Sequence, residues 1–120
     1  MFSLLNARKT TAGLSPRDAV ARAAEDRLTL IDVRGHDELA RTGKAAGAVH
    51  IPLMLLQSQA DPRHPEFHPA LSAGQPVAVY CASGARSGLA KQMLEGFGFA
   101  EVHNIGGLGD WTGAGGPLER

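Results

Sequence analysis

The sequence predicts an α/β fold in which a parallel sheet is covered by helices on both faces. Short apolar runs rich in β-branched residues alternate along the chain with segments of helical periodicity, which is typical of parallel strands joined by crossover helices. These runs show little polar alternation, as expected for strands buried on both faces. With 120 residues, of which 43% are hydrophobic, the chain is long enough for one domain with its own core.

The first element with clear start signals is a helix with Ser15 at its N-terminus. Residues 1–12 lack periodicity and are predicted to form a lead-in or a short edge strand, ahead of a domain at residues 13–118. Ser15 is suited to the N-cap and Pro16 to the first helical position, and the apolar stripe that follows runs to about Asp26.

Strands and helices then alternate to the end of the chain. The segment before Pro52 is stopped by that proline, which has no N–H for the sheet. The segment after it is the least regular, with a short buried helix predicted over the four apolar residues 53–56. The remaining elements are predicted as strands at residues 28–33, 47–52, 76–80 and 100–105, and as helices at residues 36–42, at residues 86–98 and around Trp111.

The only cysteine, Cys81, directly follows the strand at residues 76–80. Four small residues come next (Ala82, Ser83, Gly84 and Ala85), and then Arg86 at the start of a helix. The backbone N–H groups of such a loop can converge on one anion, and the helix N-terminus adds partial positive charge there. These donors and the Arg86 guanidinium favour the thiolate. An isolated buried cysteine is more often an inert small hydrophobe, but an inert cysteine needs neither this loop nor this cation.

Two charged residues, Asp32 and Arg34, lie at the end of the strand at residues 28–33. Ligands of open parallel sheets gather at the carboxyl ends of the strands, so both residues are candidates for a site near Cys81. A structural reading is at least as good: Asp32 caps the helix that begins near His36 or pairs with an arginine. The sequence leaves both readings open.

Composition excludes several classes of function. Twelve basic and twelve acidic residues cancel, which argues against a nucleic-acid partner or an anionic membrane partner, and no apolar run approaches a membrane span. Residues 1–5 are too short for the apolar part of a signal peptide. One cysteine forms no internal disulfide, so we expect a cytoplasmic protein with a free thiol. His64 and His68 have metal-like spacing, but Pro65 and Pro69 interrupt any helix that would align them, and no metal is expected.

Residues 81–87 (CASGARS) resemble the active-site loop of the single-domain rhodaneses, which are sulfurtransferases that carry a sulfane sulfur as a cysteine persulfide. Three further motifs occur in the family's order: Asp-Val-Arg at residues 32–34, Gly-Ala-x-x-Ile-Pro at residues 47–52, and Gly-Gly-x-x-x-Trp at residues 106–111. Residues 43–48 (GKAAGA) depart from the family's Gly-His-Ile-Pro-Gly-Ala. The chain therefore lacks the histidine and the proline of that motif, which are regarded as structural.

The resemblance implies a rhodanese-like fold with a central five-stranded parallel sheet, and an enzyme of the thiosulfate sulfurtransferase type. It assigns Cys81 as the nucleophile and Arg86 as the group that binds a thiosulfate-like donor, with cyanide, a thiol or a protein as sulfur acceptor and no cofactor. The loop residues are assigned to substrate binding together with Arg86: Ala82, Ser83, Gly84 and Ala85. A supporting role is assigned to Asp32, Arg34 and Ser87.

Two other functions compete with sulfur transfer. Cysteine-dependent phosphatases and arsenate reductases use a related loop, but their arginine follows six positions after the cysteine, whereas Arg86 follows five after Cys81. A loop one residue shorter wraps a tetrahedral phosphate less well. A non-enzymatic sulfur carrier or interaction module is the other alternative, and the presence of Cys81, Gly84 and Arg86 together argues for an enzyme.

Overall fold

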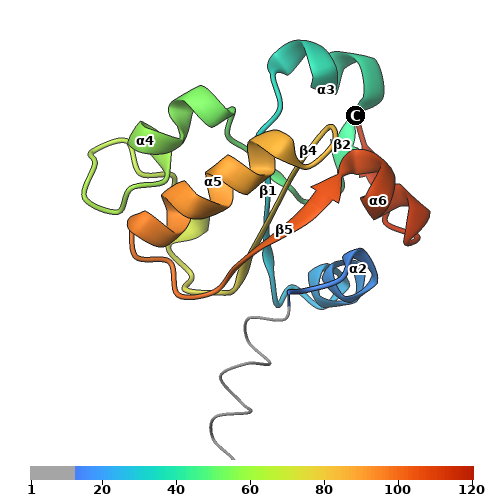
Figure 1. Ribbon diagram of the computed structural model, residues 1–120, viewed down its shortest axis with the longest axis horizontal. Helices are drawn as coiled ribbons and strands as arrows, with labels where there is room; N and C mark the ends of the chain where they lie inside the picture. Colours follow the sequence, from blue (N-terminus) through green and yellow to red (C-terminus); the bar gives the residue numbers. More distant parts are fainter. Residues whose placement is uncertain (1–12) are drawn as a thin grey trace, which may run out of the picture.

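A four-stranded parallel sheet forms the centre of the computed structural model, which describes residues 13–120 (Figure 1). The strand order is β3-β1-β4-β5, so the strand that ends at Cys81 lies in the interior of the sheet. The strands are β1 (Thr29–Asp32), β3 (Val49–His50), β4 (Val77–Cys81) and β5 (Val102–Gly107). All three pairings are parallel, which confirms the predicted α/β class.

The described residues contribute four strands to this sheet, one fewer than the resemblance implied. Gly43 has a φ of 76°, a left-handed value that glycine adopts without strain, and it turns the chain out of α3 (His36–Thr42). The next residues form β2 (Lys44–Ala45), which pairs antiparallel with β6 (Leu118–Glu119) in a separate two-stranded ribbon. The edge strand suggested for residues 1–12 lies outside the described residues.

Helices cover both faces of the sheet, with α5 (Ala85–Gly96) on one side and α2 (Pro16–Ala24) and α6 (Leu108–Gly113) on the other (Figure 1). Ser15 is the N-cap of α2, where its side chain accepts a hydrogen bond from the Asp18 N–H at 3.1 Å, as predicted. The remaining helices are short: η1 (Leu53–Leu55), α4 (Leu56–Gln59) and η2 (Pro69–Leu71).

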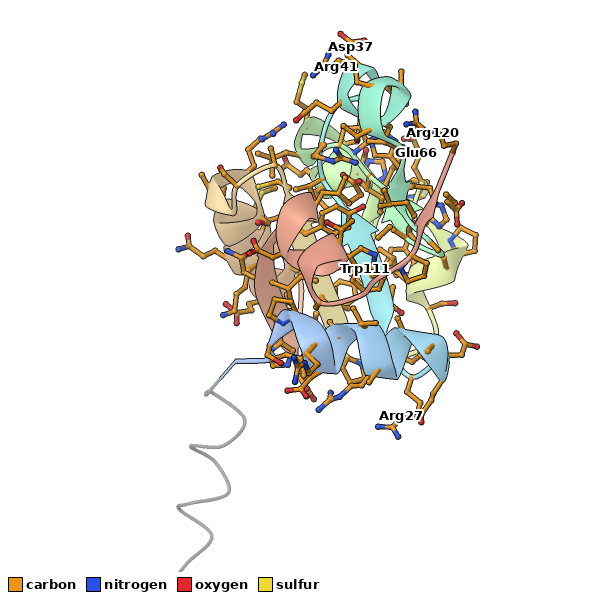
Figure 2. The ribbon with its side chains drawn as sticks, turned by 90° about the vertical axis from the view of Figure 1, so that its right-hand side faces the viewer. Arg27, Asp37, Arg41, Glu66, Trp111 and Arg120 are labelled. Atoms are coloured by element: carbon orange, nitrogen blue, oxygen red, sulfur yellow. The ribbon has the colours of Figure 1, made fainter. Side chains whose placement is uncertain are left out.

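Two hydrophobic cores lie on the two faces, because successive side chains of a strand point to opposite sides. Along β4, Val77, Val79 and Cys81 face the core beneath α5, whereas Ala78 and Tyr80 face the core beneath α2 and α6. Trp111 anchors the second core between α6 and α2 (Figure 2). This packing confirms the prediction that β4 is buried on both faces.

Several boundaries differ from the predicted ones. β5 runs to Gly107 rather than stopping at residue 105, and α2 ends at Ala24. The short helix after Pro52 is not buried throughout: Met54 is 90% exposed, and only Leu56 is fully buried, because η1 is a single turn. Within residues 13–120, no helix has the length and apolar character needed to cross a bilayer.

Candidate active site

Cys81 is the last residue of β4 and lies directly in front of α5. The predicted strand ended one residue earlier, but a register shift after Val79 brings Cys81 into the ladder opposite Gly107 of β5. The Cys81 side chain is only 1% exposed. The position of the sulfur is therefore set by the sheet, and the atoms that surround it come mainly from the loop that follows.

Backbone amides converge on the Cys81 sulfur. The N–H of Gly84 donates to Sγ at 3.0 Å and the N–H of Ser87 at 3.4 Å. Gly84 is the N-cap of α5 with a φ of 106°, a value that side-chain-bearing residues rarely adopt. The loop thus turns back over the sulfur because residue 84 is glycine, and α5 begins with its N–H groups aimed at the same point.

These contacts change the acidity of the thiol. Burial raises the pKa of Cys81, whereas hydrogen bonds from the Ser87 hydroxyl and from the N–H groups of Ser87, Ser83 and Gly84 lower it. The lowering effects are larger, and the pKa of Cys81 falls to about 7. A large fraction of the sulfur is therefore a thiolate at neutral pH, as a nucleophile requires.

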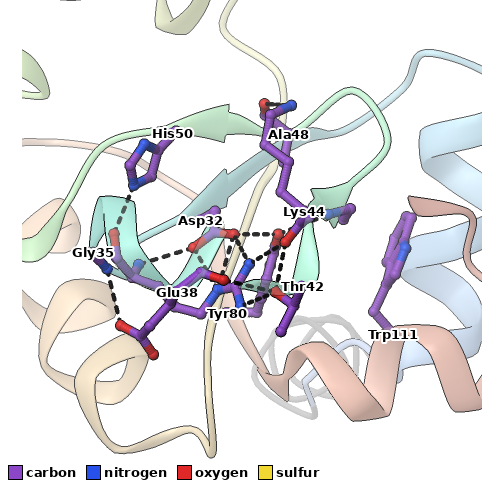
Figure 3. Close-up of polar contacts among 12 residues, drawn as sticks. Asp32, Gly35, Glu38, Thr42, Lys44, Ala48, His50, Tyr80 and Trp111 are labelled. Carbon is purple, nitrogen blue, oxygen red and sulfur yellow. Dashed lines mark hydrogen bonds and ion pairs between the residues drawn. The ribbon is translucent and has the colours of Figure 1, made fainter. Parts of the chain in front are cut away.

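Arg86 is held by a residue that the sequence analysis missed. Its two terminal nitrogens donate to the two carboxylate oxygens of Glu38 on α3, at 2.7 and 2.8 Å. Arg86 lowers the pKa of Glu38 to about 2, assisted by the N–H of Gly35. The available signal was the third position of the helix at residues 36–42, where Glu38 completes a cap on Gly35, which Figure 3 shows beside it. That signal does not indicate the pairing with Arg86.

Asp32 and Arg34 form a buried ion pair near the end of β1 (Figure 3). The Arg34 guanidinium donates to both Asp32 oxygens, to Thr42 and to the carbonyl of Gly43, and the Tyr80 hydroxyl donates to Asp32 at 2.6 Å. These bonds tie β1 to the end of α3. The geometry favours the structural reading for both residues.

The residues of the loop and of the first turn of α5 differ in exposure. Ala82, Ser83 and Ala85 are exposed on the outer side of the loop, whereas Ser87 is fully buried with Oγ 3.3 Å from the sulfur. The structure thus brings Ser87 and the loop amides to the sulfur, whereas the Asp32–Arg34 pair lies against the C-terminal end of α3, at Thr42 and Gly43.

β5 supports the loop from behind through two residues that were not predicted as part of the site. Asn104 donates to the Gly84 carbonyl at 3.0 Å and accepts from the Ser87 hydroxyl at 2.7 Å. A Cβ atom on Gly107 would overlap the carbonyl oxygen of Ala82. The Gly-Gly motif at residues 106–107 therefore allows close approach of the loop as well as a turn into α6.

The two histidines with metal-like spacing have local roles. His64 accepts a hydrogen bond from the N–H of Glu66, and His68 accepts one from the N–H of Ala70 at the start of η2. In the part of the chain that the structure describes, no three His, Cys, Asp or Glu side chains gather where they could hold a metal ion.

The sequence is similar to proteins of sulfur metabolism. It is 34% identical over 80 residues to the thiosulfate sulfurtransferase PspE of Escherichia coli, covering 67% of this chain and 70% of that protein. It is 31% identical over 91 residues to the putative sulfur carrier protein YrkF of Bacillus subtilis, covering 75% of this chain and 44% of that protein.

Two solved structures and a family model also match the chain. A Rhodopseudomonas palustris protein of unknown function, a possible tyrosine phosphatase, superposes with a TM-score of 0.79 at 30% identity, covering 93% of this chain and 89% of that one. A human single-domain sulfurtransferase superposes with a TM-score of 0.68 at 28% identity, covering 84% and 95%. The rhodanese-like domain model matches residues 15–114. The loop around Cys81 and the four-stranded sheet beneath it are accordingly those of a rhodanese-like domain, the family to which this chain belongs.

Proposed function

We propose that the protein is a sulfurtransferase that moves a sulfane sulfur from thiosulfate or a related donor to cyanide or a thiol, through a persulfide on Cys81. The observation that carries this proposal is the convergence of the Gly84 and Ser87 amides on the Cys81 sulfur at the N-terminus of α5. Such an arrangement stabilises a negatively charged sulfur both before and after transfer. Because an oxidised cysteine is inactive in this chemistry, a reducing, cytoplasmic location is part of the proposal.

The reaction has two balanced steps. In the first, the Cys81 thiolate attacks the outer sulfur of thiosulfate, an S–S bond forms to Cys81, and the S–S bond of the donor breaks to release sulfite with its electron pair. In the second, cyanide or a thiolate attacks the outer sulfur of the persulfide, and the Cys81 thiolate leaves. The enzyme alternates between two covalent states, which predicts ping-pong kinetics.

Arg86 is the cation that we assign to the donor. Its side chain is 40% exposed at the edge of the loop, and its field acts on Cys81. Glu38 occupies the two terminal nitrogens, so a dianionic donor binds at the remaining N–H groups or displaces the carboxylate. The exposed loop residues Ala82, Ser83 and Ala85 then face the donor, and a small thiol or a protein thiol is the acceptor in the cell.

Mass spectrometry of the intact protein tests this proposal. Thiosulfate is expected to add one sulfur, about 32 Da, which cyanide or dithiothreitol removes, as a covalent intermediate requires. Cys81→Ser is expected to gain no mass. An unchanged mass in the native chain, with its thiol shown to be free, would contradict sulfur transfer. Turnover of p-nitrophenyl phosphate that depends on Cys81 and exceeds sulfur transfer would favour a phosphatase instead.

A further inference from the structure

The Ser87 hydroxyl has one hydrogen and three acceptors that compete for it, of which the Gly106 carbonyl, at 3.4 Å, is the most distant. Ser87 Oγ lies 3.3 Å from Cys81 Sγ and 2.7 Å from Asn104 Oδ1, and the Ser87 side chain is fully buried. A hydroxyl donates only one hydrogen bond. When the sulfur is a thiolate it accepts, and when it is a thiol it donates its own hydrogen, so the direction of the Ser87 bond depends on the state of Cys81.

The orientation of the Asn104 amide is fixed by its other partners. The N–H of Gly106 can only donate, and it contacts Oδ1 at 3.0 Å. The carbonyl of Gly84 can only accept, and it contacts Nδ2 at 3.0 Å. Flipping the amide would break both bonds, so the atom that faces Ser87 is an oxygen. The 2.7 Å contact between two oxygens therefore needs the Ser87 hydrogen.

We propose that Ser87 and Asn104 form a two-position hydrogen-bond switch coupled to Cys81. The Ser87 hydroxyl donates to Asn104 while the sulfur carries a proton or a second sulfur, and it donates to the sulfur while that is a free thiolate. Asn104 is a positioning residue that acts on Cys81 through Ser87. The part of the switch that concerns the persulfide rests on the proposed function, and the part that concerns the proton does not.

The switch has a consequence for reactivity. To stabilise the thiolate, Ser87 must give up its bond to Asn104, so Asn104 limits how far the acidity of Cys81 can increase. A thiolate that keeps more of its basicity is a better nucleophile, provided that the thiol still ionises near the ambient pH. In the persulfide the charge lies on the outer sulfur, and Ser87 can return to Asn104. The first effect speeds the attack of the thiolate on the donor. The second stabilises the persulfide relative to the free thiolate.

The charged groups around Cys81 are the same in the native chain, Asn104→Ala, Ser87→Ala and the double variant. Arg86 of α5 acts on the sulfur directly and is neutralised by Glu38 of α3. Four further groups near the sheet have partners of their own: Asp32 with Arg34, His50 with the Arg34 carbonyl, His103 with Glu101, and Asp110 with the Gly107 N–H. On the two helices that face the loop, α3 also carries His36, Asp37 and Arg41, and α5 carries Lys91 paired with Glu95. A shift in Cys81 ionisation between the variants therefore reports the hydrogen bonds.

A double-mutant cycle on Cys81 ionisation tests the switch. The pH dependence of thiolate absorbance is measured, without any sulfur donor, in the native chain, Asn104→Ala, Ser87→Ala and the double variant. The chain has one cysteine, and burial raises the pKa of Tyr80, the one tyrosine, so the signal belongs to Cys81. We expect Asn104→Ala to lower the pKa of Cys81 by about 0.5 to 1 unit, the worth of one net hydrogen bond. In the Ser87→Ala background the same substitution should change nothing.

The cycle separates the switch from loop anchoring. Asn104 also holds the Gly84 carbonyl, and an effect through the loop would appear equally in both backgrounds, which would overturn the proposal. So would an unchanged pKa in Asn104→Ala. If that variant does not fold, Asn104→Asp replaces it: its carboxylate competes more strongly for the Ser87 hydrogen and should raise the pKa more with Ser87 present than in Ser87→Ala. Because no donor is present, failure here leaves sulfur transfer standing, and absence of the persulfide leaves the proton switch standing.

Discussion

Glu38 of α3 and Arg86 of α5 meet in a two-point ion pair, with oxygen–nitrogen distances of 2.7 and 2.8 Å. The pair joins the helix that follows β1 to the helix that follows Cys81. The far end of α3 is held by Arg34, which donates to Thr42 and to the Gly43 carbonyl. The position of the cation beside Cys81 is thus set by contacts that reach back to the buried end of β1.

Replacing Glu38 with glutamine should reduce stability in a pH-dependent way. The pKa of Glu38 in the folded protein is about 2, below its ordinary value of 4.5. A lowered carboxyl pKa stabilises the fold above the ordinary value, and this stabilisation is lost as the pH falls towards 2. Because the Arg86 side chain is 40% exposed, solvent screening limits the effect to about 1 kcal/mol at pH 7. Urea unfolding at pH 7 and at pH 2 to 3 measures the difference.

The matched control for this substitution is Glu95→Gln. Glu95 pairs with Lys91 one turn away on the exposed side of α5 and has no contact with the loop. Glu95→Gln should lower the free energy of unfolding less than Glu38→Gln does. If Glu38→Gln loses the same free energy of unfolding at both pH values, the loss does not depend on the ionised carboxylate and the ion pair with Arg86 contributes nothing.

Arg86→Ala should slow the first half-reaction more than the second. Losing one charge-assisted contact to a dianion in a partly exposed site costs about 1.5 to 3 kcal/mol, roughly tenfold to a hundredfold in the rate of persulfide formation from thiosulfate. Lysine should recover part of the rate, since it keeps the charge without the two-point geometry. Stopped-flow measurement of each half-reaction decides the point, with Lys91→Ala as a control cation on the same helix.

Arg86→Ala also changes the charge that an incoming donor meets. Arg86→Ala leaves the Glu38 carboxylate unpaired beside the loop, where it repels a dianionic donor. Adding Glu38→Gln should therefore restore part of the lost rate. Equal losses in the two half-reactions would mean that Arg86 maintains the shape of the loop, and its assignment to the donor would be wrong.

The rate of persulfide formation should follow the ionisation of Cys81. The pKa of the thiol is lowered to about 7, and the thiolate is the reacting form, so the rate rises with pH and levels off above that value. At pH 6 it should be about tenfold below the plateau. Glu38 stays ionised throughout this range because its pKa is about 2, so one inflection is expected. A rate that is constant between pH 6 and 8 would show that Cys81 is not the titrating nucleophile.

The sequence was sufficient for features that depend on neighbouring residues. The alternation of strands and helices, the N-cap at Ser15 and the loop that turns its amides towards Cys81 all follow from local composition and spacing. The pairing of Glu38 with Arg86 spans 48 positions, and nothing in the local pattern of either helix requires it. The β2–β6 ribbon likewise depends on where the end of the chain returns.

The role of Asn104 illustrates a different limit. It lies in a strand, where alternation predicts only which face a side chain takes. Its contacts with Ser87 and Gly84 depend on the register shift that places Cys81 opposite Gly107, and a register shift of this kind has no signature in the residues of β4.

Gly107→Ala should impair the loop without removing any reacting group. A Cβ on residue 107 would overlap the Ala82 carbonyl oxygen, so the loop must move away from β5. The N–H groups of Gly84 and Ser87 then no longer point at the sulfur. A displacement of about 1 Å is enough to cost on the order of a hundredfold in rate. Gly109→Ala on α6 is the matched control, because a Cβ there has no atom within 4 Å. Comparable persulfide formation in both variants would show that the loop tolerates the shift.

Arg34→Met should destabilise the fold strongly, because it leaves the Asp32 carboxylate buried without its cation. The Arg34 and Asp32 side chains are 3% and 0% exposed, and breaking such a pair from one side costs about 3 to 5 kcal/mol. Tyr80→Phe removes the hydrogen bond to Asp32 and also leaves the Ala45 N–H, which donates to the same hydroxyl, without its partner; it should cost less, about 1 to 3 kcal/mol. Replacing Asp32 with leucine as well as Arg34 with methionine should restore part of the stability, since no unpaired charge then remains. Urea unfolding of these three variants and of Asp32→Leu tests this order. If the double variant loses as much free energy of unfolding as Arg34→Met and Asp32→Leu together, the loss arises from packing around β1 and not from the isolated charge.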